Sequence, residues 1–125
     1  MKKVIKTDQA PSAIGPYSQG IDLGNLVFTS GQIPLNPKTG QLVADDIQAA
    51  ARQSMDNVKA VLEAAGTSLQ NVIKTTVFVK DLNDFAAVNE VYGSYFEGDC
   101  PARSCVQVAK LPMDALVEIE AIAIK

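Results

Sequence analysis

The sequence contains no histidine, and this absence excludes several kinds of catalytic site. A Ser-His-Asp triad and a Cys-His dyad both need an imidazole as the base that activates the nucleophile. Histidine-assisted ribonuclease chemistry is excluded in the same way. Any chemistry of this chain must therefore use Arg, Lys, Tyr, Asp, Glu, Ser, Thr or backbone groups.

Cysteine is scarce as well, because the chain has only Cys100 and Cys105. Two thiols without histidine cannot supply the four nitrogen or sulfur ligands of a usual zinc site. Their spacing also differs from the CxxC of redox motifs. We therefore expect no metal site of this kind and reduced thiols, as in a cytoplasmic protein.

Long apolar runs are absent too. No window approaches the 18 consecutive apolar residues of a membrane span, and Lys6 interrupts the N-terminal stretch that begins like a signal peptide. Eleven basic and fourteen acidic residues give a net charge of −3, which is not the charge expected of a nucleic-acid binder. The composition favours a soluble cytoplasmic protein with neither a membrane nor a nucleic acid as partner.

The 125 residues, with a mass of 13.3 kDa, predict one domain over residues 1–125. A chain of this mass buries about two-thirds of its unfolded surface, enough for one core. Apolar and turn residues alternate in a way that predicts eight elements in the order β, ββ, α, β, α, ββ. These are strands at 2–6, 20–23, 26–29, 72–79, 102–108 and 115–124, a helix from Asp45 or Asp46 to Gly66, and a second helix from Asp81 or Asn83 to Gly98.

This order is an α+β pattern, with one mixed sheet and two helices on one of its faces. The final strand is apolar on both sides, because Ile119 and Ala121 alternate with Ile122 and Ile124. Two helices can cover only one face of a sheet. We therefore expect the second face to meet another subunit.

Arg103 is the most informative charged residue, since it stands in an otherwise neutral strand pattern, where Cys105 and Gln107 share its face. A fixed guanidinium suits two-pronged capture of a carboxylate or phosphate. An edge-strand arginine or an internal salt bridge is an equal alternative from spacing alone. If the last two strands form an antiparallel hairpin, Arg103 faces Glu118, and Glu120 lies two residues away on the same face.

Three further features are candidates for a site. Cys105 lies near Arg103, but without a base we interpret it as a pocket-lining residue and not as a nucleophile. The loops that contain Tyr17 and the Ser30-Gly31 pair offer small residues, a phenol and exposed backbone N–H groups. Neither loop matches a phosphate-binding or dinucleotide-binding fingerprint.

Several long segments, in order, resemble the RidA/YjgF family of reactive-intermediate deaminases. They are AIGPYS (13–18), TSGQIP (29–34), NVIKTTVFV (71–79), PARSCV (101–106) and VEIEAIA (117–123), and the resemblance covers almost the whole chain. It implies a chorismate-mutase-like fold, a homotrimer with ligand sites at subunit interfaces, and no metal or organic cofactor. The implied reaction is hydrolysis of 2-enamine and 2-imine acids, such as 2-aminoacrylate or 2-iminopropionate, to 2-keto acids and ammonia.

The resemblance also implies roles for individual residues. The carboxylate-binding arginine of the family falls on Arg103, and its water-positioning glutamate falls on Glu118. The remaining site positions fall on Tyr17, Ser30, Gly31, Phe85, Asn89 and Cys105. The loop at 97–100 departs from many relatives, because it is short and carries Cys100, so the edge of the pocket is not defined by the resemblance.

Two alternatives stay open at this stage. The same pocket would serve a trimeric binding or regulatory module that recognises a small carboxylate without catalysis. Some family members have been described as endoribonucleases or translation inhibitors, but the lack of histidine and the acidic charge disfavour that reading. Keto-acid and ammonia release from a freshly generated imine would separate the enzyme from the binding module.

Overall fold

The computed structural model describes all residues, 1–125, and contains one mixed sheet of six strands and two α-helices. The α+β class is therefore confirmed, and it is consistent with a chorismate-mutase-like fold. The strands are β1 (Lys3–Ile5), β2 (Gly20–Asp22), β3 (Leu26–Thr29), β4 (Val72–Val79), β5 (Ala102–Gln107) and β6 (Val117–Ile124), and the helices are α1 (Ile47–Ala64) and α2 (Phe85–Gly93). Neither helix is long and apolar enough to cross a membrane.

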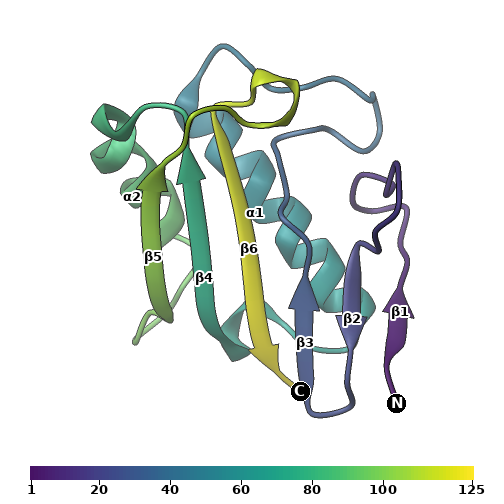
Figure 1. Cartoon of the computed structure of the whole chain (residues 1–125). Coiled ribbons are helices and arrows are strands. Elements are labelled where there is room, and N and C mark those ends of the chain that lie inside the picture. Colours follow the sequence, from purple (N-terminus) through teal and green to yellow (C-terminus); the bar gives the residue numbers. More distant parts are fainter.

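The strand order is β1-β2-β3-β6-β4-β5, so β4 separates the last two strands of the chain (Figure 1). The expected antiparallel hairpin between β5 and β6 is therefore wrong. Arg103 pairs with Thr75 in a parallel ladder, and Glu118 pairs with Phe78 in an antiparallel one. The crossover through α2 returns the chain beside β4 in the same direction, which makes β5 a parallel edge strand.

Helix α1 begins and ends as its sequence predicts. The Asp46 side chain accepts a hydrogen bond from the N–H of Gln48 at 3.0 Å, which caps the first turn. Gly66 follows the last turn with φ +85°, a backbone conformation that glycine adopts without a Cβ penalty. The buried side of α1 carries Met55, Val58 and Leu62 into the core.

Helix α2 is shorter than predicted. Asp81 caps a single 3-10 turn at Leu82–Asp84, and its carboxylate accepts from the N–H of Asn83 at 2.9 Å. The α-helix itself runs only from Phe85 to Gly93, so Tyr95 and Phe96 lie beyond its end instead of on its apolar stripe. The sequence pattern merged these turns because apolar spacing continues across them.

Both helices lie on one side of the sheet (Figure 1). On that side β6 buries Val117, Ile119, Ala121 and Ala123. The opposite side, which we call the open face, has no helix over it and carries Phe28, Phe78, Glu118, Glu120, Ile122 and Ile124. The open face is thus partly apolar and accessible in a single chain.

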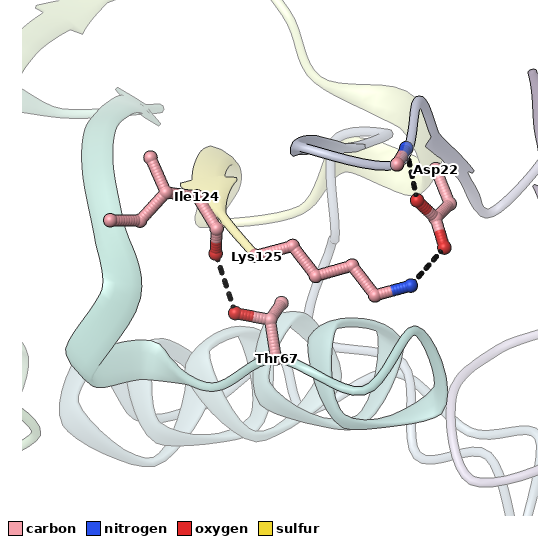
Figure 2. Close-up of polar contacts among 5 residues, drawn as sticks. Asp22, Thr67, Ile124 and Lys125 are labelled. Carbon is pink, nitrogen blue, oxygen red and sulfur yellow. Dashed lines mark hydrogen bonds and ion pairs between the residues drawn. The ribbon is translucent and has the colours of Figure 1, made fainter.

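The end of β6 is fastened at two points (Figure 2). Lys125 Nζ lies 2.6 Å from Asp22 Oδ2, and the other carboxylate oxygen of Asp22 accepts from the N–H of Gly24 at 2.7 Å. The Thr67 hydroxyl donates to the carbonyl of Ile124 at 2.7 Å. These contacts join β6 to the β2–β3 turn and to the segment after α1, and they hold the strand that carries Glu118.

Candidate functional site

The Arg103 side chain lies on the helix side of the edge strand β5 and is half-buried. Nη1 donates to Asn89 Oδ1 at 2.7 Å, and its other N–H groups donate to no atom of the chain. The chain forms three ion pairs, and none of them involves Arg103. A half-buried guanidinium without a counter-ion is suited to bind an anion such as a carboxylate.

Three side chains from one face of α2 contact this guanidinium. Phe85, Asn89 and Tyr92 are spaced i, i+4 and i+7, so they project from the same side of the helix. The guanidinium carbon lies 5.4 Å from the centre of the Phe85 ring and 4.9 Å from that of Tyr92. Both distances are within the range of cation–π attraction.

Phe85, Asn89 and Tyr92 therefore lie beside Arg103, whereas the resemblance implied only that Phe85 and Asn89 line the site. Sequence reasoning assigned Tyr92 only to the apolar stripe of the helix. Its spacing of i+3 from Asn89 was the signal that could have placed it beside the arginine.

Cys105 follows Arg103 on the same side of β5 and is also half-buried. Burial raises the pKa of this thiol, and the nearby Arg103 charge only partly opposes the rise. The group is a neutral thiol at neutral pH, with little of the thiolate that a nucleophile needs. Cys100 is an exposed free cysteine in the loop before β5.

A second group of residues gathers around the loop that follows β3. Ser30 lies beside the Tyr17 loop, because its N–H donates to the carbonyl of Gln19 at 2.9 Å and its hydroxyl donates to that of Ser18 at 2.5 Å. Tyr17 is exposed, and its phenol oxygen accepts only a long, 3.4 Å bond from the N–H of Ile14. The phenol therefore remains available to a ligand.

Gly31 brings this loop against Glu118. A Cβ on Gly31 would collide with Oε2 of Glu118 and would lie 2.8 Å from its Cδ, so the carboxylate rests on the glycine backbone. Reciprocal backbone hydrogen bonds between Gln32 and Ile119, of 2.8 and 3.1 Å, hold the loop beside β6. Ser30, Gly31 and Glu118 thus lie together, with the loop that carries Tyr17 bonded to Ser30.

The Glu118 carboxylate is half-buried and accepts no hydrogen bond or ion pair from the chain. Burial is the main cause that raises its pKa above the ordinary value, and the negative charge of Glu120 adds to the rise. A carboxyl group with a raised pKa exchanges protons closer to neutral pH than an exposed one. Glu118 is therefore suited to accept and return a proton.

The two groups do not meet in one chain. Arg103 lies on the side of the sheet that α1 and α2 cover, as its register partner Thr75 does, whereas Glu118 lies on the open face beside Phe78. The expected cross-strand Arg103–Glu118 pair is therefore absent. That expectation assumed that consecutive strands pair, and the crossover through α2 places β4 between them.

A hollow of about 810 Å³ lies between the N-terminal segment and the Tyr17 loop. It is lined by Lys6, Asp8, Tyr17 and Gln19, among others, but by neither Arg103 nor Glu118. We therefore base the candidate site on the two residue clusters, because the groups that suit carboxylate binding and proton transfer lie there.

Comparison with known proteins identifies relatives over the full chain. The family model described as Endoribonuclease L-PSP matches residues 7–125. The 2-iminobutanoate/2-iminopropanoate deaminase of Escherichia coli strain K12 is 61% identical over 128 residues, which cover 100% of this chain and 99% of the relative. The TdcF protein of the same strain is 59% identical over 128 residues, which cover 100% of this chain and 98% of the relative.

Solved structures agree with these matches. The structure of the Escherichia coli YjgF gene product has a TM-score of 0.95 at 60% identity and covers 98% of each chain. That of Escherichia coli TdcF with bound serine has a TM-score of 0.94 at 56% identity, again over 98% of each chain. The fold and the sequence thus indicate the same set of relatives.

Proposed function

The chain belongs to the RidA/YjgF family, and we propose that its Arg103 and Glu118 bind and hydrolyse reactive 2-enamine and 2-imine acids. The protein is a hydrolytic deaminase that converts such acids, for example 2-iminobutanoate or 2-iminopropanoate, to 2-keto acids and ammonia. The uncompensated guanidinium of Arg103 is the observation that carries the site assignment, because every substrate of this class has a carboxylate next to the reacting carbon.

Arg103 anchors that carboxylate in our proposal. Its free N–H groups offer the planar fork that matches two carboxylate oxygens, while Asn89 Oδ1 accepts a hydrogen bond from Nη1. Phe85 and Cys105 contribute apolar surface beside the bound acid, where they suit the short alkyl chain of a substrate. Serine in the related TdcF structure is likewise a small 2-amino acid.

Glu118 activates the attacking water and transfers the protons of the reaction. The carboxylate accepts a proton from water as the water oxygen bonds to C2 and the C=N electron pair moves to nitrogen. The same carboxyl group then returns that proton to nitrogen, which gives a neutral carbinolamine. The carboxylate next takes the proton of the carbinolamine hydroxyl and passes it to nitrogen, so that the C=O bond forms as the C–N bond breaks. Ammonia leaves and the 2-keto acid remains. The raised pKa of Glu118 suits both transfers, and the Tyr17 hydroxyl, whose proton is not donated within the chain, can donate a hydrogen bond nearby.

Because Arg103 and Glu118 lie on opposite sides of one sheet, we propose that neighbouring subunits of a homotrimer complete each site. One subunit supplies Arg103, Phe85, Asn89 and Cys105, and the next supplies Tyr17, Ser30, Gly31 and Glu118. The open face supports this arrangement, since it is partly apolar and leaves Ile124 47% exposed in a single chain. Burial of such a face between copies is favourable by the hydrophobic effect.

We place the protein in the cytoplasm in this proposal, because both cysteines are free thiols and cytosolic proteins rarely form disulfides. The partners are a small-molecule acid and further copies of the same chain. The net charge of −3 and the absence of histidine offer no support for a ribonuclease site.

The test measures keto acid and ammonia from 2-iminobutanoate, which an amino-acid oxidase generates in situ from 2-aminobutanoate and O2, with and without the protein. We expect the purified protein to accelerate the release of both products in equal amounts. Arg103→Ala and Glu118→Gln should reduce the acceleration in protein that still folds. Binding of 2-oxobutanoate without any acceleration would instead support a carboxylate-binding module and contradict the enzyme.

A further inference from the structure

We propose that Tyr92 and Thr75 are positioning residues, and that their hydrogen bond fixes the orientation in which Arg103 receives the substrate carboxylate. The inference rests on the proposed anchor role of Arg103. It gives a function to two buried hydroxyl groups, that of Thr75 on β4 and that of Tyr92 on α2. Neither group needs to touch the substrate.

The two hydroxyls connect the three elements around the guanidinium. Thr75 Oγ1 and Tyr92 OH are hydrogen-bonded at 2.6 Å, and both residues are buried, with 2% and 5% of their surface exposed. Thr75 is also the register partner of Arg103 across the β4–β5 ladder. The bond therefore ties the tip of the Tyr92 ring to the strand position beside Arg103.

The Tyr92 ring in turn supports the guanidinium. Its centre lies 4.9 Å from the guanidinium carbon, and the Phe96 ring packs on Tyr92 at 5.0 Å with a tilt of 50°. Burial raises the pKa of the phenol, so Tyr92 is neutral at physiological pH and does not cancel the charge of Arg103. The ring provides a polarised surface of fixed orientation without providing a counter-ion.

A fixed ring is useful because Arg103 makes only one hydrogen bond within the chain. A single bond from Nη1 to Asn89 leaves the plane of the guanidinium free to rotate about that bond. Two-pronged recognition of a carboxylate requires one defined plane. A buried hydroxyl is also costly unless it is bonded, and phenylalanine would fill the same core volume without that requirement.

The experiment removes the bond one atom at a time. Tyr92→Phe deletes the phenol oxygen and keeps the ring. Thr75→Val deletes the hydroxyl and keeps the volume, whereas Thr75→Ser keeps the hydroxyl and deletes only the methyl group. The matched control is Thr67→Val, which removes the bond that the Thr67 hydroxyl donates to the Ile124 carbonyl and the one that it accepts from Asn71 Nδ2. Each variant is tested as the full-length assembled protein, with melting temperature, KM and kcat for 2-iminobutanoate.

Inhibition constants are measured in parallel for 2-oxobutanoate, which is the keto-acid product, and for 2-oxobutanamide, its uncharged amide. We expect Tyr92→Phe and Thr75→Val to raise KM and the 2-oxobutanoate constant about twofold to tenfold, the range that one hydrogen bond supplies. kcat should change less, because the anchor holds substrate and transition state alike. The inhibition constant for 2-oxobutanamide should stay unchanged, and Thr75→Ser should keep most of the wild-type affinity for 2-oxobutanoate.

The double variant Tyr92→Phe/Thr75→Val should be no worse than the poorer single variant, since both remove the same bond. Thr67→Val should lower the melting temperature and leave the acid-to-amide ratio unchanged. An unchanged ratio in Tyr92→Phe would overturn the positioning role, whatever its melting temperature. An unchanged ratio in Arg103→Ala would instead overturn the anchor role of the proposed function, so the two failures are distinguishable.

Discussion

The carboxylate of Glu118 lies directly on the backbone of Gly31, with no room for a side chain between them. A Cβ at position 31 would lie 2.8 Å from Glu118 Cδ and would overlap Oε2. Gly31 is thus needed for a close approach, and its φ is not positive. The loop after β3 sets the position of the group that we propose to move protons.

Gly31→Ala should therefore displace Glu118, which should lower kcat strongly and the melting temperature only slightly. We expect kcat to fall about tenfold to a hundredfold, because a shift of about 1 Å in a catalytic group can cost two orders of magnitude. Gly93→Ala is the matched control, since a Cβ there meets nothing within 4 Å. Kinetics per folded protein, beside thermal melts, checks the prediction, and a fully active Gly31→Ala would contradict it.

Acid should inactivate the enzyme as Glu118 takes up a proton. The mechanism that we propose needs the carboxylate form, and burial and Glu120 both raise the pKa of Glu118, so activity should be lost below that raised pKa. Glu120→Gln removes the like charge and lowers the pKa. The acidic limb of the kcat/KM profile should then move to lower pH. A shift toward higher pH, or none, would show that Glu118 does not govern this limb.

The sequence predicted the local elements of the fold well, because local signals decide them. Asp46 and Gly66 mark the ends of α1, and the Gly24-Asn25 turn joins β2 to β3 in the expected hairpin. The register of the last two strands was wrong because it depends on a contact that no local pattern encodes. The crossover from β4 through α2 places β5 beside β4, so Arg103 pairs with a residue of β4 although β6 follows β5 in the sequence.

The candidate site divides in the same way. Arg103 stood out as a lone charge in a neutral strand, and the resemblance named Phe85 and Asn89 as site positions, but their contacts with Arg103 come from the structure. The bond between Thr75 and Tyr92 was not predictable, because a threonine in a strand and a tyrosine on an apolar stripe are ordinary core residues. Only the packing of α2 on β4 brings the two hydroxyls together.

The pair of Asp22 with Lys125 should make stability depend on pH. The hydrogen bond from Lys125 is the main cause that lowers the pKa of Asp22, and the Gly24 N–H also lowers it. The contribution is thus complete above the ordinary pKa of aspartate and disappears as the pH falls through the lowered value. Asp22→Asn should melt earlier than wild type at pH 7, with the difference vanishing at strongly acidic pH. Asp114→Asn, at a more exposed pair, should have a smaller effect at pH 7.

Cys105→Ser should retain substantial deaminase activity. The structure contains no histidine to activate the thiol, and burial raises its pKa, so little thiolate exists at neutral pH. The assay is turnover of 2-iminobutanoate, with mass spectrometry of wild type during the reaction. A covalent adduct on Cys105, or an inactive variant with the native assembly, would show that the thiol takes part in the chemistry.

Arg103→Lys should not restore the function that Arg103→Ala removes. Lysine keeps the positive charge, but its ammonium lacks the planar fork that binds two carboxylate oxygens and cannot stack in the same way on Phe85 and Tyr92. Loss of one charged hydrogen bond costs roughly 1.5–3 kcal/mol, which corresponds to about a tenfold to hundredfold loss in kcat/KM.

Arg103→Ala should cost more, because no group remains to hold the carboxylate, although its melting temperature need not fall. A merely structural arginine would behave in the opposite way: Arg103→Lys would then alter the melting temperature and leave turnover per folded protein nearly unchanged. Kinetics normalised to folded protein, measured beside thermal melts of the same samples, separates the two cases. Near-wild-type turnover of 2-iminopropanoate by folded Arg103→Ala would reject the anchor, and with it the mechanism in which Arg103 holds the acid while Glu118 of the neighbouring subunit delivers water to C2.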